Sequence, residues 1–421
     1  MNLIDTFGSW VGQLALRSPD QARRLLLTGY RALNLVYRLA PQRFPFSRCY
    51  AAKTTLNLMI RVLSDPDQAA MVSLFTPCEP LLAAGITPYS VEALSCYLMG
   101  THCERVFLET TEKTGIPETL CSYHRTFLGA AENGIMPKPR FIIYTNLACD
   151  GNMLTFPYLK QKFNVPSFFI NVPYEKNEDS VCFVAEQLRQ ATCFIQDLTG
   201  KEILEDHLIL YTARSRKASE DYAKALRLLS ERRIPESPTD EMYKVLLSHI
   251  LLGSPESEKY FRLFLEDAQH APLWDGLRLI WLHTIPYEQP AVKTRFGQNP
   301  RAFLTACDLA YESLIPYPDA DPYRVMAKRM VFSCFNGSLD LRMEYAKKAA
   351  TLTGADGAVL FAHWGCKNTL GSSRLIKQAL EESGLLTLVL DGDGCDPANN
   401  SDGQMATRLD AFLELLEGNR R

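Results

Sequence analysis

The sequence has no pair of cysteines at C-x-x-C spacing, although its 421 residues include twelve cysteines. Zinc ribbons, thioredoxin-type pairs and ferredoxin-type runs all need that spacing, so these three kinds of site are excluded. The chain also lacks a G-x-x-x-x-G-K-[ST] loop, and we therefore expect no nucleotide hydrolysis within it. Any metal site must be assembled from thiols that lie far apart in the sequence.

Long apolar runs and a strong net charge are missing as well. No stretch approaches the roughly eighteen consecutive apolar residues of a membrane span. The net charge of -3 is not the strongly basic charge that is typical of a nucleic-acid-binding protein. The first residues, MNLIDTFGSW, carry an acid where a secretory signal would carry basic residues. We therefore expect a cytoplasmic protein, whose reducing surroundings keep thiols out of disulfides.

Some of the cysteines are expected simply to fill the core, because cysteine is among the most buried residue types. Cys182 in DSVCFVAEQ, Cys193 in ATCFIQ and Cys334 in VFSCF stand among apolar neighbours. We predict that these three thiols are small buried packing groups.

The length and composition predict more than one domain. Apolar residues make up 47% of the chain and charged residues 22%, which is typical of a globular protein, and 421 residues exceed one ordinary core. The order of helical and strand-like segments predicts an α/β protein with two Rossmann-like (flavodoxin-like) parallel-sheet domains. The expected parts are an N-terminal helical segment (1–65), a first α/β domain (66–215), a helical bridge (216–270) and a second α/β domain (271–421).

The N-terminal segment is markedly basic. Between Arg17 and Arg61 it carries nine Lys or Arg and one acid, Asp20. Pro41 and Pro45 interrupt its helical pattern, so two or more helices are expected. The basic residues form either a solvated face or a contact for a phosphate-bearing ligand or acidic partner.

Two β-α-β units are predicted, one in each α/β domain. In the first, a strand over 141–145 precedes a helix over 152–163, and PSFFINVP is the next strand. In the second, GAVLFAH is a strand, Ser372 or Ser373 caps the following helix, Gly384 ends it, and LLTLVLD is the next strand. The two strands of each unit should be parallel.

Cysteines follow the first strand of both units. Cys149 comes after RFIIYT, and Cys366 comes after GAVLFAH. Ligands of open α/β sheets bind beyond the carboxyl ends of the strands, so these thiols can converge if the two domains face each other. Cys121 is a third candidate, because a turn precedes it and an amphipathic helix follows. A helix start would favour a thiolate or an anionic cluster there.

Four segments together resemble the 2-hydroxyacyl-CoA dehydratase family, which also contains benzoyl-CoA reductase subunits. They are FTPCEPLLAAGITP, PETLCSYHRTFLGA, NLACDGN and the C-terminal run that begins HWGCKNTLGSSRLIKQALEESGLLTLVLDGDGCDP. The resemblance covers roughly residues 70–421. It implies a [4Fe-4S] cluster between α/β domains, with ligands that fall on Cys121, Cys149 and Cys366.

The resemblance also implies a reaction and partners. The substrate would be an acyl-CoA thioester, which loses water from its 2-hydroxyacyl group through a ketyl radical after one-electron reduction. The electron would come from a separate ATP-hydrolysing iron-sulfur activator. The chain would pair with a related second subunit as a heterodimer, or with itself as a homodimer. The basic N-terminal helices would suit that subunit contact or the phosphates of coenzyme A.

Further residues carry possible roles in such a site. Thr76 and Glu79 match a segment that approaches the cluster and thioester in relatives, and Glu79 is a candidate base; alternatively, both simply begin a helix. His124 and His363 are candidate hydrogen-bond donors to cluster sulfur, or structural histidines. Cys395 is a rival cluster ligand.

Three extra thiols leave other functions open. Cys78, Cys96 and Cys103 stand near the family motifs. They either pack in the core or mark an ATP-dependent reductase with a double-cubane cluster. A different alternative is an electron-relay or scaffold subunit that does not turn over substrate.

Overall fold

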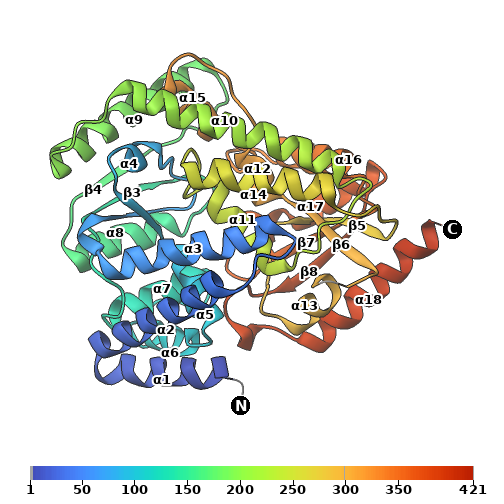
Figure 1. The fold of residues 1–421 in the computed structure, drawn as a ribbon, viewed down its shortest axis with the longest axis horizontal. Coiled ribbons are helices and arrows are strands. Elements are labelled where there is room, and N and C mark those ends of the chain that lie inside the picture. The colour runs from blue at the N-terminus through green and yellow to red at the C-terminus, as the bar shows by residue number, and fades with distance from the viewer. Residues whose placement is uncertain (1–2, 298, 421) are drawn as a thin grey trace.

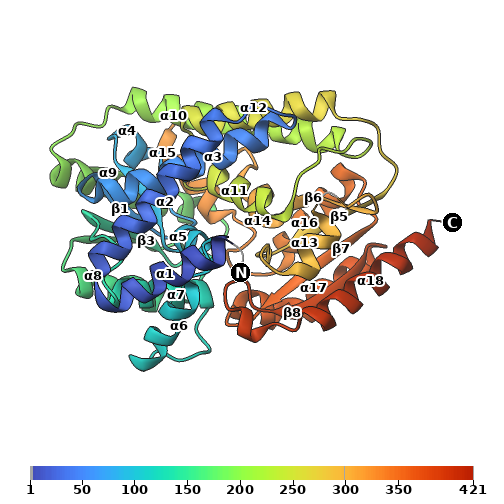
Figure 2. The ribbon, with the colours of Figure 1, turned by 60° about the horizontal axis from the view of Figure 1, so that its bottom comes forward.

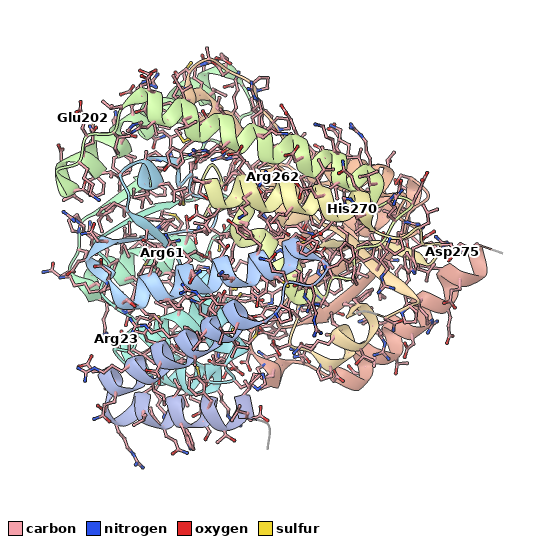
Figure 3. The ribbon with its side chains drawn as sticks, viewed as in Figure 1. Arg23, Arg61, Glu202, Arg262, His270 and Asp275 are labelled. Atoms are coloured by element: carbon pink, nitrogen blue, oxygen red, sulfur yellow. The ribbon has the colours of Figure 1, made fainter. Side chains whose placement is uncertain are left out.

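The computed structural model describes residues 3–297 and 299–420 and begins with three helices (Figure 1). These are α1 (Leu3–Arg17), α2 (Pro19–Leu39) and α3 (Phe46–Ser64), as the helical pattern predicted. Pro41 and Pro45 lie in the link between α2 and α3. Part of the basic charge is paired, since Arg48 contacts Asp240 at 3.1 Å. Figure 3 shows Arg23 on α2 and Arg61 on α3 among the side chains that cover these helices.

The first sheet has four parallel strands in the order β2-β1-β3-β4. The strands are β1 (Ala69–Val72), β2 (Thr87–Ser90), β3 (Phe141–Thr145) and β4 (Ser167–Ile170). Every residue of β1 and β3 is buried, as expected for strands covered on both faces. Helix α8 (Asn152–Phe163) joins β3 to β4, which confirms the first predicted β-α-β unit.

The second sheet repeats the arrangement with the order β6-β5-β7-β8, again all parallel. Its strands are β5 (Leu277–Leu282), β6 (Ala302–Cys307), β7 (Gly357–His363) and β8 (Leu386–Gly392). Helix α17 (Lys367–Glu382) joins β7 to β8, so the second β-α-β unit is confirmed. Two helix-flanked parallel sheets therefore form the predicted α/β fold.

The prediction that Ser372 or Ser373 caps α17 is wrong. Cys366 occupies the cap position, and both serines lie inside the helix. Their hydroxyls donate to the carbonyls of Asn368 (2.6 Å) and Leu370 (3.0 Å). A serine inside a helix can bond to its preceding turn in this way, so serine alone does not mark a helix start. Gly384 follows the end of the helix with φ +86°, as predicted.

The other helices cover the sheets and link the two halves. They are α4 (Glu79–Ala83), α5 (Val91–Gly100), α6 (Glu104–Lys113), α7 (Ser122–Glu132), α9 (Glu178–Thr199), α10 (Glu205–Leu228), α11 (Pro238–Ser248), α12 (Pro255–His270), α13 (Pro290–Phe296), α14 (Asp308–Ser313), α15 (Pro322–Val331), α16 (Asp340–Thr353) and α18 (Asp402–Asn419). Figure 2 shows α10 and α12 running along one side of the molecule, with the first sheet at one end and the second at the other. Helix α10 contacts α4 in the first half and α16 in the second. Helix α10 spans residue 216, where the predicted helical bridge begins after the first α/β domain. The division of the chain into four parts stays a prediction.

The cysteines are all free thiols. Cys334 is buried, as predicted, but Cys182 and Cys193 are exposed, so their assignment to the core is wrong. Both lie on α9, whose buried face includes Val184 and Leu188, and the helical turn places the two thiols away from this face.

A membrane-spanning helix is not found in the described part of the chain, where each helix is too short or too polar to cross a bilayer.

His102 ties α1 to the second half of the molecule and makes stability depend on pH. Its Nδ1 lies 2.6 Å from Asp5 Oδ1, and its Nε2 lies 3.6 Å from Glu288 Oε2. The neighbouring carboxylates of Glu288 and Asp5, opposed by partial burial, raise the pKa of His102 from 6.5 to about 9. The charged imidazole therefore contributes stability that is fully present below about pH 6.5 and is lost as the pH rises through about 9.

We expect His102→Asn to reduce the pH dependence of the free energy of unfolding between pH 6.5 and 9, by at most about 1 kcal/mol because solvent screens the pair. Asparagine suits the left-handed backbone at this position, where φ is 56°. Urea unfolding across this pH range measures the effect. The control His207→Asn changes an exposed histidine of α10. An unchanged pH slope in His102→Asn would contradict the prediction.

Candidate functional site: a thiol-lined cavity between the two sheets

A cavity of about 590 Å³ lies between the two halves, and both sheets contribute the carboxyl ends of their strands to it. Cys121, Cys149 and Cys366 all line this cavity. The structure thus brings together three thiols that are far apart in the sequence. Convergence at the strand ends is what the topology of open parallel sheets predicts.

Local backbone geometry presents each of these thiols. Cys149 follows β3 in a turn where Ala148 adopts φ 66°, and Cys121 caps α7. Cys366 caps α17 after Gly365, whose φ is +80°. A side chain at Gly365 would come within 2.8 Å of the Cys121 nitrogen. Glycine therefore lets the loops of the two halves meet at the cavity.

Burial dominates the protonation of the three thiols. It raises the pKa of Cys121, with further increases from Cys149 and Cys366. It also raises the pKa of Cys149, to which the Glu92 carboxylate adds, and the pKa of Cys366. The expectation that a helix start favours the Cys121 thiolate is therefore wrong for the free thiol, because desolvation outweighs the helix terminus.

Two buried histidines contact two of the thiols. His363 Nε2 lies 3.2 Å from Cys121 Sγ, and His124 Nε2 lies 3.4 Å from Cys149 Sγ. Both side chains are about 1% exposed. Burial lowers the pKa of each histidine. The rings are thus neutral at physiological pH, and each has one N–H to donate.

The sequence interpretation missed Glu92, which lines the same cavity. Its Oε1 lies 3.9 Å from His124 Nε2, and its Oε2 accepts a hydrogen bond from the Ser90 hydroxyl at 2.7 Å. Ser90 ends β2, so Glu92 satisfies the same strand-end rule as Cys149. The strand before Glu92 was not recognised in the sequence because β2, with the sequence TPYS, is short and contains a proline.

Thr76 and Glu79 do not line the cavity. Glu79 is buried in an ion pair with Arg329 (2.8 Å) and accepts a hydrogen bond from the Ser215 hydroxyl (3.2 Å). Thr76 contacts Ser73 through their hydroxyls at 2.8 Å. Glu79 is the first residue of α4, whereas Thr76 does not cap that helix. Their catalytic role stays a prediction, and their contacts are structural ones.

The other candidate thiols are spread over different environments. Cys78, Cys103 and Cys395 are buried and are not part of the cavity wall, while Cys96 does line it. Cys395 lies 3.3 Å from the Thr126 hydroxyl. Among the cysteines that rivalled the three-thiol set, Cys96 is thus the one at the cavity.

The three thiols at the cavity are ligands of the kind that iron-sulfur clusters use. Within residues 3–297 and 299–420, no three His, Cys, Asp or Glu side chains converge on a position for one metal ion. In an iron-sulfur cubane, each thiolate binds a different iron, so the ligands surround a cluster rather than one ion. Thiolates are the usual ligands of such clusters. Three partly buried thiols around one cavity are the type of ligand that a cubane uses.

The fold and the cavity together define an α/β protein with a thiol-lined site at the junction of two parallel sheets. The family model described as 2-hydroxyglutaryl-CoA dehydratase, D-component, matches residues 73–416. This match covers most of the chain, and the chain belongs to that family. The resemblance seen in the sequence motifs is thereby confirmed.

Similar proteins include three dehydratase alpha subunits. The chain is 22% identical to the (R)-phenyllactyl-CoA dehydratase alpha subunit of Clostridium sporogenes, over 73% of this chain and 79% of that protein. It is 23% identical to the (R)-2-hydroxyisocaproyl-CoA dehydratase alpha subunit of Clostridioides difficile, over 74% and 81%. It is 22% identical to the (R)-2-hydroxyglutaryl-CoA dehydratase subunit alpha of Acidaminococcus fermentans, over 68% and 62%. Distant homologues of the chain are thus alpha subunits of 2-hydroxyacyl-CoA dehydratases.

Proposed function

We propose that this chain is the iron-sulfur subunit of a cytoplasmic 2-hydroxyacyl-CoA dehydratase. Cys121, Cys149 and Cys366 would hold a [4Fe-4S] cluster. The observation that carries the proposal is that three partly buried thiols from both halves line one cavity. The partners would be a related second subunit, or a second copy of this chain, and a separate ATP-hydrolysing iron-sulfur activator.

The bound cluster would supply one-electron transfer to the acyl-CoA and a Lewis-acidic iron. The chain itself would orient the thioester and keep water away. Glu92 is the carboxylate placed to accept a proton, because it lies in the cavity wall and its side chain is 19% exposed. His124 beside it holds an N–H toward both Glu92 and Cys149.

Cys96 supports a second candidate. It lines the cavity with the three proposed ligands, as an additional ligand of a larger cluster would. An ATP-dependent reductase with a double-cubane cluster, related to benzoyl-CoA reductase, is therefore the alternative enzyme. A subunit that relays electrons or serves as a scaffold would differ from both in lacking acyl-CoA turnover.

Anaerobic purification with the second subunit, followed by iron and sulfide analysis, tests the proposal. About four irons per chain support a single cubane, and about eight support the double-cubane alternative. Turnover of 2-hydroxyacyl-CoA by the reduced complex then separates a dehydratase from a relay or scaffold. A chain without iron under these conditions would refute the proposed function.

The lining of the cavity predicts the acyl group. Leu74, Phe75, Met242, Leu246 and Phe335 contribute apolar surface. We therefore expect 2-hydroxyisocaproyl-CoA or phenyllactyl-CoA to be dehydrated with a kcat/KM at least about tenfold above that of 2-hydroxyglutaryl-CoA. The second carboxylate of the glutaryl group would lose its hydration in an apolar cavity that already contains Glu92. Steady-state kinetics with the three thioesters measures this ratio, and a preference for the glutaryl substrate would contradict it.

A further inference from the structure

His363 is held in one tautomer by the protein backbone. It is the last residue of β7, and its Nδ1 lies 3.0 Å from the backbone nitrogen of Gly394. A backbone N–H can only donate, so Nδ1 must accept and carries no proton. The proton of the neutral ring is therefore on Nε2, which lies 3.2 Å from Cys121 Sγ. The imidazole thus donates a hydrogen bond to this thiol.

The loop that presents Gly394 is fixed by its own polar groups. Asp393 Oδ1 accepts the backbone N–H groups of Cys395 and Asp396, both at 2.9 Å. The Asn400 side chain accepts from the Asp393 N–H and donates to the Asp393 carbonyl, both at 2.7 Å. A side chain at Gly394 would come within 2.5 Å of Tyr123 Oη. These hydrogen bonds within the run DGDGCDPANN fix the direction of the Gly394 N–H, which donates to His363 Nδ1.

His124 makes a parallel contact with Cys149. Its Nδ1 lies 2.8 Å from the Thr155 hydroxyl. Its Nε2 faces two acceptors, Cys149 Sγ at 3.4 Å and Glu92 Oε1 at 3.9 Å. These acceptors favour the proton on Nε2, with Thr155 donating to Nδ1. No comparable histidine contact to Cys366 is present among the described residues.

We propose that His363 is a positioning residue that donates its Nε2–H to the Cys121 thiolate and raises the reduction potential of the cluster. The inference rests on the proposed function, because it needs the cluster to be bound. A hydrogen bond to a ligand sulfur withdraws negative charge from it, so the reduced cluster gains more stability than the oxidised one. The loop over 393–400 sets the donor direction, and His124 acts in the same sense on Cys149.

Redox titration of the anaerobically purified complex, followed by electron paramagnetic resonance, tests the inference. His363→Leu removes the donor and is expected to bind wild-type iron but to have a more negative midpoint potential. His363→Gln keeps an N–H near the position of Nε2, so its potential should lie closer to that of wild type. Asn400→Ala loosens the loop without touching the cavity and should shift the potential in the same direction as His363→Leu, by a smaller amount.

The outcomes separate the inference from the proposed function. Wild-type iron content with an unchanged potential in His363→Leu overturns the inference and leaves the cluster ligands in place. Should His363→Leu lose its iron, the decision passes to Asn400→Ala, whose potential must become more negative. Absence of iron from the wild-type complex would instead remove the proposed function itself.

Discussion

Serine in place of Cys149 or Cys366 is expected to lower the iron content of the anaerobically purified complex from about four per chain to below one. The serine hydroxyl stays protonated where a thiolate would bind, and two remaining thiols do not hold a cubane. Both side chains line the cavity, one from each half of the molecule. Dehydration of 2-hydroxyacyl-CoA should fall below detection in both variants. Iron analysis and the visible absorbance of the cluster measure the loss.

Two other cysteines provide matched controls for this experiment. Cys193→Ser changes an exposed thiol on α9, and Cys395→Ser changes a buried thiol beside Thr126. Both variants should keep wild-type iron. If Cys395→Ser lost the cluster while Cys366→Ser kept it, the proposed ligand set would be wrong and Cys395 would take the place of Cys366.

Lys244→Met should destabilise the fold by about 3–5 kcal/mol at neutral pH, because it leaves buried carboxyl groups without their cation. The Lys244 side chain is 0% exposed, contacts Glu241, and lies 3.5 Å from Glu236. It also lies 4.4 Å from the centre of the Phe264 ring. The midpoint of urea unfolding measures the change. Lys348→Met, which breaks an exposed pair with Glu344, should stay within about 0.5 kcal/mol of wild type.

The pH dependence gives this second prediction a distinct signature. Burial raises the pKa of Glu236 to about 8, although Lys244 opposes the shift. The folded chain therefore binds a proton that the unfolded chain releases near its ordinary value of 4.5, and stability falls as the pH rises from about 4.5 to 8. Without Lys244 the pKa of Glu236 rises further and this fall extends to higher pH, so the variant should be closer to wild type at pH 5 than at pH 8. The double variant Lys244→Met, Glu241→Gln should recover part of the loss. Equal destabilisation at both pH values would contradict the role assigned to the buried carboxyls.

Local sequence patterns predicted the parts of the fold whose signals are contiguous. FIIYT and GAVLFAH are buried strands followed by clear helices, so both β-α-β units and the thiols at their ends could be found. Strand β2 is short and contains Pro88, and Glu92 at its end was therefore missed. A few neighbouring residues do not show which face of a helix a cysteine occupies, which is why Cys182 and Cys193 were wrongly assigned to the core.

Contacts across long sequence separations could not be predicted from the sequence. Glu79 was a candidate base because its neighbours match a family motif, whereas its partner Arg329 lies 250 positions along the chain. No local feature of either residue indicates their pairing. The same holds for the contact of His363 with Gly394, which depends on how a loop after β8 turns back toward β7.

The repeated strand order explains why two of the thiols oppose each other. Cys149 follows the third strand of the order β2-β1-β3-β4, and Cys366 follows the third strand of β6-β5-β7-β8. Strands β3 and β7 therefore occupy equivalent places in their sheets. Each half contributes a thiol from the point where its strand order reverses, which is the usual ligand position in such sheets.

The distribution of the cavity thiols along the chain also bears on biogenesis. Cys366 emerges from the ribosome long after Cys121 and Cys149, so the full set exists only when the second sheet has been synthesised and has folded against the first. Loading of the proposed cluster would then follow translation, and the newly made protein would need to keep its thiols intact until that step. Burial raises the pKa values of these thiols, and thiolates are the forms that oxidants attack. The folded chain would therefore be protected from oxidation until the proposed cluster is inserted.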